Sequence, residues 1–168
     1  MKRKAERIPE TITEQEFSEI LKDKKLKGHH KLAFALGFYN CLRISEIVNL
    51  KQENIDWNRK LLLIKEAKGK KDRNIPIAPE VMNGLKHIPV NISIRALQFA
   101  FKKIAKQVLN KDLHTHTLRH SGATHYLNIK KWDIRQVQVF LGHSRINITE
   151  IYTHVNPQDL VNKMWGEE

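Results

Sequence analysis

Cysteine is almost absent from this chain, because Cys41 is the only one among 168 residues. A single thiol excludes an intrachain disulfide and a thiolate metal cage, and it favours a reducing compartment. Long apolar runs are also missing, so no segment reaches the length of a membrane span. The basic start at residues 1–7 is not followed by an apolar stretch, and we therefore expect no secretory signal peptide.

Acidic residues are few relative to basic ones. The chain has 18 Asp and Glu against 30 Lys and Arg, a formal net charge of +12 and a pI near 9.9. Such an excess predicts a polyanionic partner, nucleic acid first and an anionic membrane surface second. Lysines that only keep the surface soluble would give the same composition. The length suits one domain with a full core.

The hydrophobic pattern predicts a mainly helical α+β fold with one small antiparallel β-hairpin or sheet. Thr13 and Glu16 form a capping box, and Ile12 and Phe17 a hydrophobic staple, so we expect a helix to start at Thr13. Asp133 and Gln136 resemble a second capping pair. Further helices are expected around residues 32–39, 45–50, 93–110, 117–128, 133–141 and 147–154, the last of them ended by Pro157 and followed by a small apolar tail.

Two short apolar runs, Leu61–Ile64 and Asn74–Ile77, flank turn-forming residues at 69–72, which predicts the hairpin. Pro76 has no backbone N–H, and it therefore implies an exposed edge strand. The hairpin tip is basic, with Lys68, Lys70, Lys71 and Arg73. Such a tip suits a phosphate track or the DNA minor groove, although a solvated turn would have the same composition.

Histidines gather around an arginine in the last third of the chain. His116 and Arg119 lie three residues apart, so at a helix start both could face one pocket and hold a phosphate. A solvated basic helix end is the alternative. His114, His116, His120 and His125 could instead indicate zinc, but the metalloprotease glutamate is missing and no cysteine or carboxylate cluster supplies another ligand. We therefore expect no metal.

Tyr152 is the candidate nucleophile among three tyrosines. Tyr39 and Tyr126 have apolar helix surroundings and are expected in the core, whereas polar neighbours leave the Tyr152 hydroxyl accessible. A phenol needs nearby cations or a base before it can attack. His143 follows Gly142, which is expected to end a helix in the left-handed conformation, and would project from a loop.

Arg43 stands between two apolar residues and precedes Glu46, its expected buried partner. A purely structural ion pair is the alternative for this segment.

Together these segments resemble the catalytic domain of the tyrosine recombinases, the integrase and Xer-type site-specific DNA recombinases. The resemblance covers about residues 13–165, with four motifs in the family's order. They are Cys41-Leu42-Arg43-Ile44-Ser45-Glu46 (first arginine box), 68–77 (β-hairpin lysine motif), 116–125 (His-x-x-Arg box), and 141–144 with 149–154 (nucleophile box).

The resemblance implies that Tyr152 attacks a DNA phosphodiester and forms a 3′-phosphotyrosyl bond. Arg43 and Arg119 would hold the non-bridging oxygens, and Lys68 would protonate the departing 5′-oxygen. His116 would assist proton movement at the Tyr152 hydroxyl.

The remaining implied roles belong to supporting and binding groups. His143 would hydrogen-bond the phosphate, Glu46 and His120 would support the site, and Lys70, Lys71 and Arg73 would contact DNA. Neither a metal nor another cofactor is implied. The partners would be double-stranded DNA and further copies of the chain, in a tetrameric synapse formed with the help of the tail 158–168.

For the domains, we expect a basic arm at 1–12 and the catalytic domain at 13–168, without the core-binding domain that usually precedes it. The chain would then be a fragment or a minimal form, located in the cytoplasm of a prokaryote or virus-infected cell beside the nucleoid. Two other functions remain open: a non-catalytic basic DNA-binding protein on the same scaffold, and an activity like that of a type IB topoisomerase.

Overall fold

The structure, a computed structural model, describes residues 10–65, 72–142 and 157–166. This part of the chain is mostly helical with a small antiparallel sheet, as predicted. Its helices are α1 (Glu14–Lys22), α2 (Gly28–Tyr39), α3 (Ile44–Asn49), α4 (Pro79–Met82), α5 (Ile94–Leu109), α6 (Thr115–Asn128), α7 (Ile134–Leu141) and α8 (Pro157–Trp165), and its strands are β1 (Ile55–Asp56), β2 (Leu61–Ile64) and β3 (Arg73–Pro76).

Local capping sets the first turn of two helices as predicted. The Thr13 hydroxyl accepts a hydrogen bond from the Glu16 N–H, and the Glu16 carboxylate accepts one from the Thr13 N–H. Asp133 and Gln136 form the same reciprocal pair at α7. Both boxes satisfy backbone donors that a helix start would otherwise leave without partners.

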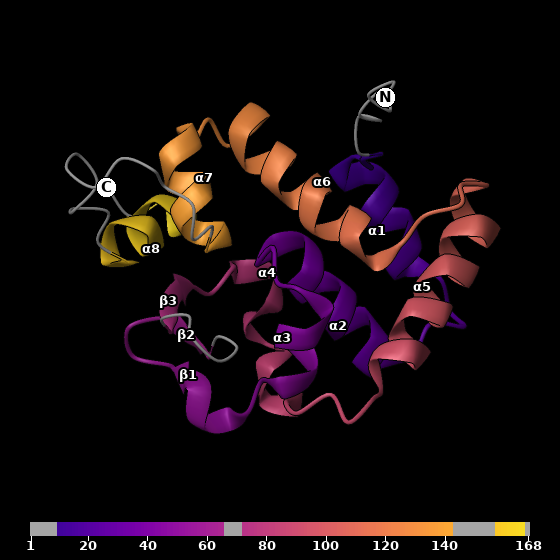
Figure 1. The fold of residues 1–168 in the computed structure, drawn as a ribbon, viewed down its shortest axis with the longest axis horizontal. Coiled ribbons are helices and arrows are strands. Elements are labelled where there is room, and N and C mark those ends of the chain that lie inside the picture. The colour runs from indigo at the N-terminus through magenta and orange to yellow at the C-terminus, as the bar shows by residue number, and fades with distance from the viewer. Residues whose placement is uncertain (1–9, 66–71, 143–156, 167–168) are drawn as a thin grey trace, which may run out of the picture.

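Helix α2 is the centre of the core. Figure 1 shows it between α1, α5 and α6, with the sheet and α8 lying toward the other side of the molecule. All its residues from Leu32 to Tyr39 are buried, rather than one stripe only, because other helices pack around it. Tyr126 is also buried, as predicted, and its hydroxyl donates to the Tyr39 carbonyl over 2.7 Å.

Helix α6 packs closely against α2 at Gly122. A Cβ placed on Gly122 would lie 2.0 Å from the Phe38 carbonyl oxygen and 2.7 Å from the Cys41 sulfur. Only a residue without a side chain permits this approach, which brings the last turn of α2 against the middle of α6.

The sheet has the order β1-β2-β3, and both pairs are antiparallel. Strands β2 and β3 are the predicted hairpin, in a register that places Leu61 opposite Pro76 and Ile64 opposite Arg73. Pro76 lies on an edge strand as predicted, but it is buried, so the expected exposure of this edge is wrong. The reason is that α8 packs against β3.

The end of the chain differs from the prediction. Pro157 begins helix α8, whereas the sequence pattern placed the last helix before it. Leu160 and Val161 are buried, and the Trp165 indole N–H donates to the Ile77 carbonyl over 2.9 Å. The predicted helix at 147–154 lies outside the described residues. Among the helices that the structure describes, none is long and apolar enough to cross a membrane.

Replacing Gly122 with alanine is expected to reduce the free energy of unfolding by about 3 kcal/mol, because the new methyl group collides with a backbone carbonyl. Gly28→Ala is the control: nothing lies within 4 Å of a Cβ there, so stability should change by less than about 1 kcal/mol. Urea unfolding followed by circular dichroism measures both. Equal stability of the two variants would contradict the close α2–α6 contact.

Candidate active site

Three arginines from different elements surround the carboxylate of Glu46. Its Oε1 accepts a hydrogen bond from Arg43 Nη1 at 2.8 Å and from Arg73 Nη1 at 3.0 Å. Its Oε2 lies 3.9 Å from Arg119 Nη1. One negative charge is thus shared by three guanidinium groups from the start of α3, the start of β3 and the first half of α6.

Capping explains where Glu46 points. Glu46 is the third residue of α3, and its Oε2 accepts the backbone N–H of Arg43 at 2.8 Å. The side chain therefore folds back over the helix start, where Arg43 also lies. This confirms Glu46 as the partner of Arg43 that the sequence suggested.

The turn between α2 and α3 orients Arg119. Cys41 has a left-handed backbone, with φ of 51°, and its carbonyl accepts a hydrogen bond from Arg119 Nη1. Arg119 Nη2 donates to the Leu141 carbonyl at 2.6 Å, at the end of α7. The Arg119 side chain, which is 6% exposed, is thus held by two backbone carbonyls. Its position therefore follows from the packing of α2, α6 and α7.

Burial and charge act against each other in this cluster. Burial alone would raise the pKa of Glu46, but the Arg73 hydrogen bond and charge, the Arg43 N–H and the Arg119 charge outweigh it and hold that pKa below 4.5. Burial and the nearby Arg43 lower the pKa of Arg119 to about 10, against the opposing effect of Glu46. At neutral pH the carboxylate and the guanidinium are therefore both ionised.

Burial raises the pKa of the Cys41 thiol to about 12, so this buried cysteine is not a thiolate nucleophile at neutral pH.

His116 lies beside the arginines. Partial burial lowers its pKa, and His120, Arg119 and Arg43 lower it further. Its imidazole is therefore neutral at pH 7 and able to accept a proton. The side chain lines a cavity of about 400 Å³ that also includes Ile44 and Phe99.

The other two histidines of this helix have different surroundings. The His120 ring centre is 5.5 Å from that of His116, and both residues are exposed. His125 is buried near Glu14, which marks it as part of the scaffold.

Arg73 occupies a position that its sequence context does not indicate. A lysine-rich hairpin tip predicts a DNA contact, but the structure places the Arg73 side chain on Glu46, where it is 12% exposed. Local sequence carries no signal for this contact, because Glu46 and Arg73 are 27 residues apart.

Several predicted residues lie outside the described part of the chain. Lys68, Lys70 and Lys71 belong to the connection between β2 and β3, and His143 and Tyr152 belong to the connection between α7 and α8. The structure describes the residue before the second connection: Gly142 ends α7 in the predicted left-handed conformation, with φ of 67°.

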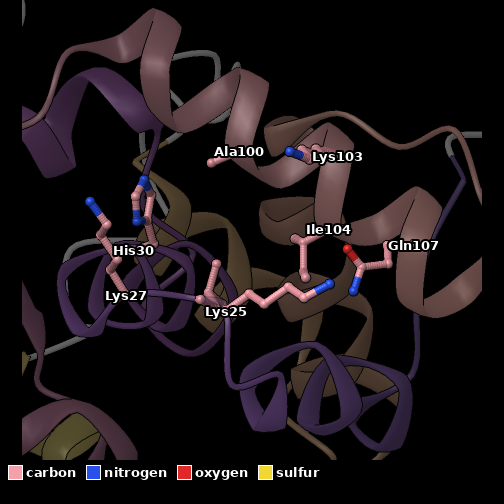
Figure 2. A pocket seen from close by; sticks show the side chains of 8 residues that line it. Lys25, Lys27, His30, Ala100, Lys103, Ile104 and Gln107 are labelled. Carbon is pink, nitrogen blue, oxygen red and sulfur yellow. The ribbon is translucent and has the colours of Figure 1, made fainter.

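A separate cavity of about 170 Å³ lies between the α1–α2 connection and α5 (Figure 2). Lys25, Lys27 and Lys103 make its surroundings basic, while Ala100 and Ile104 line it with apolar atoms. It is at the beginning of α2, and the arginine cluster follows the end of that helix. No cluster of three or more potential metal ligands occurs within the described residues.

Comparison with known proteins identifies the chain. The model of the Phage integrase family matches residues 10–93 and 89–159. The chain belongs to this family. It is 34% identical to a tyrosine recombinase of Thermosipho africanus, over 91% of this chain and 60% of the relative. It is 32% identical to the tyrosine recombinase XerA of Thermococcus onnurineus, over 91% of this chain and 61% of that protein. The chain thus spans about 60% of the length of these curated relatives.

Solved structures share the fold of this member of the phage integrase family. The integrase of mycobacterium phage Brujita has a TM-score of 0.81 at 19% identity, covering 99% of this chain and 60% of the other. A XerA recombinase has a TM-score of 0.73 at 23% sequence identity, and the match covers 96% of this chain and 65% of the other. The lambda integrase catalytic core has 0.67 at 19%, covering 80% of this chain and 92% of the other. The fold of a tyrosine recombinase catalytic domain is thereby confirmed.

Glu46→Gln should destabilise the chain by about 3 kcal/mol at pH 7, because the buried Arg119 and the partly buried Arg43 and Arg73 lose their shared anion. Since the folded pKa of Glu46 lies below 4.5, its stabilisation is complete above that pH and is lost as the pH falls through the folded value. Urea unfolding measured from pH 7 to pH 3 should show that acid-dependent loss in the wild type and much less of it in the variant. Glu19→Gln, an exposed site on α1, is the control and should follow the wild type. Identical pH dependence for Glu46→Gln and wild type would contradict a central role of this carboxylate.

Proposed function

We propose that this chain cleaves and rejoins DNA strands as the catalytic part of a site-specific recombinase, through a 3′-phosphotyrosyl intermediate. The observation that carries the proposal is the convergence of Arg43, Arg73 and Arg119 on Glu46, beside the neutral imidazole of His116. Planar cations that already have fixed orientations suit the anionic oxygens of a phosphodiester, and they stabilise charge that develops during its substitution.

In the proposed first step, the Tyr152 oxygen attacks phosphorus and the bond from phosphorus to the 5′-oxygen breaks. His116 assists removal of the phenolic proton, and Lys68 supplies a proton to the departing 5′-oxygen. Arg43 and Arg119 hold the non-bridging oxygens, and His143 donates to one of them. Attack by a 5′-hydroxyl of the partner strand then restores a phosphodiester and releases Tyr152. The phosphotyrosyl bond conserves the energy of the broken bond, so the cycle requires no nucleotide hydrolysis.

Double-stranded DNA is the proposed substrate. The net charge of +12 supports a polyanionic partner. Two structural neighbours are described as complexes with DNA, a Tn1549 transposon integrase and a lambda integrase dimer bound to a core site. Lys70 and Lys71 remain predicted phosphate contacts. The curated relatives named above come from prokaryotic cells, in which the DNA lies in the cytoplasm. A DNA substrate is therefore consistent with the predicted cytoplasmic location.

Self-association on DNA is part of the proposal, since a lambda integrase tetramer is known on a Holliday junction. The tail 158–168 is the predicted contact between copies. Leu160 and Val161 are buried in the fold of their own chain. A contact between copies through these two side chains would therefore require α8 to exchange between neighbours, as in domain swapping, whereas exposed tail residues such as Asn162 and Lys163 can contact a neighbour directly.

A suicide substrate tests the cleavage step. DNA nicked close to the cleavage site loses a short 5′-hydroxyl fragment after attack, so the covalent adduct accumulates and migrates slowly on a denaturing gel. The wild type should form it on a cognate site, and Tyr152→Phe should not, because only the phenolic oxygen is removed. Lack of adduct with the wild type on every related site would contradict the enzymatic proposal.

Two control measurements separate the alternatives. A non-catalytic DNA-binding protein would show only salt-sensitive affinity, with a log–log slope of about −0.9 for each phosphate neutralised. Relaxation of supercoiled DNA by monomers, without strand exchange, would indicate an activity like that of a type IB topoisomerase.

A further inference from the structure

Arg73 connects three parts of the molecule that meet at the arginine cluster. It is the first residue of β3, and Ile64 at the end of β2 pairs with it, so it lies where the connection carrying Lys68 returns to the sheet. Its Nη1 donates to Glu46 on α3 at 3.0 Å. Its side chain also packs on the end of α7, as the surroundings of Gly142 show.

The Arg73 side chain occupies the space that a side chain at position 142 would need. A Cβ built on Gly142 would lie 2.6 Å from both Cδ and Nε of Arg73 and 2.8 Å from its Cζ. The glycine therefore meets two requirements: its φ of 67° ends α7, and its missing side chain leaves space for the guanidinium. Leu141, one residue earlier, accepts the hydrogen bond from Arg119, and His143 follows directly in the sequence.

We propose that Arg73 is a positioning residue for the DNA cleavage reaction, and that it does not act as a contact to the DNA backbone. It holds the Glu46 carboxylate in place, and through Glu46 it orients Arg43, which donates to the same carboxylate oxygen. By packing on Gly142 it also sets the chain direction at the residue before His143. This inference rests on the proposed function, because the reaction it serves is strand cleavage.

The geometry explains why the residue is an arginine. A guanidinium is planar, so one edge can donate to Glu46 while its face and stem pack against a glycine backbone. Lysine would keep the charge but has neither the fork nor the plane. At 12% exposure, Arg73 is also more buried than Arg43, at 29%. Arg119 is still less exposed, at 6%, so what distinguishes Arg73 is its set of contacts: it donates to Glu46, and its side chain packs on Gly142.

Arg73→Gln tests the proposal, with Arg59→Gln as the matched control in the exposed turn between β1 and β2. Loss of a phosphate contact would reduce the magnitude of the salt slope of DNA binding by about 0.9. We expect no change of slope for Arg73→Gln. We expect instead that adduct formation at saturating DNA slows by about 10- to 100-fold, since small errors of position cost that much in rate.

Coupling to Glu46 provides the decisive readouts. If Arg73 acts through Glu46, the double variant Glu46→Gln/Arg73→Gln should cleave no more slowly than about the slower single variant. In Arg73→Gln the Glu46 carboxyl, followed by carbon-13 NMR, should titrate at higher pH than in the wild type, because a hydrogen-bonding cation is gone. Arg59→Gln should change none of these quantities.

The outcomes separate the two proposals. A lower salt slope with an unchanged cleavage rate, or multiplicative losses in the double variant, would overturn the positioning role. If the wild type forms no adduct, the proposed function fails, while the salt slope and the Glu46 titration still decide what Arg73 does. Should Arg73→Gln not fold, Arg73→Lys is the second variant: it keeps the charge, and normal cleavage by it would contradict the need for a guanidinium.

Discussion

The shared ion pair at Glu46 is the interaction on which the rest of the site depends. A buried carboxylate is costly unless it is paired and hydrogen-bonded, and three neighbouring guanidinium groups would repel one another without an anion among them. The three guanidinium groups supply the pairing that the buried carboxylate needs, and the carboxylate supplies the anion that reduces their mutual repulsion. Because Glu46 is 7% exposed, solvent screens these interactions little, and the arrangement holds α3, β3 and α6 together at one point.

The backbone geometry of the scaffold brings the segments that carry the arginine cluster together. Gly122 allows α6 to lie against the last turn of α2, and the chain then turns at Cys41 in a left-handed conformation before α3 begins. The same turn presents the carbonyl that holds Arg119, and the end of α7 presents the second. The guanidinium orientation thus follows from the packing of a core whose centre is α2. Such a site is organised before a substrate arrives, which is what transition-state stabilisation requires.

Features that depend on neighbouring residues could be predicted from the sequence. The capping boxes at Thr13 and Asp133 and the pairing of Arg43 with Glu46 involve residues three positions apart, and the hairpin was predicted from two short apolar runs on either side of turn-forming residues. The four motifs in their order also identified the family. Those predictions rest on interactions between residues close in sequence and on the spacing of the four motifs.

Features that depend on tertiary contact could not be predicted. Strand β1 has two residues and no pattern of its own, and the contact of Arg73 with Glu46 joins distant segments. Cys41 adopts its positive φ although it is neither glycine nor asparagine, because the surrounding packing determines the turn. The sequence pattern predicted only an apolar tail after Pro157, yet proline suits the first turn of a helix, and α8 packs against β3.

The central claim is that the arginine cluster serves attack by a tyrosine on a DNA phosphate. Its most direct test is mass spectrometry of the wild-type chain trapped on nicked DNA and digested with trypsin and nuclease. The account predicts one nucleotide-bearing peptide, with the phosphate attached to Tyr152. A phosphate attached to any other residue, or the absence of a modified peptide after demonstrated DNA cleavage, would contradict it.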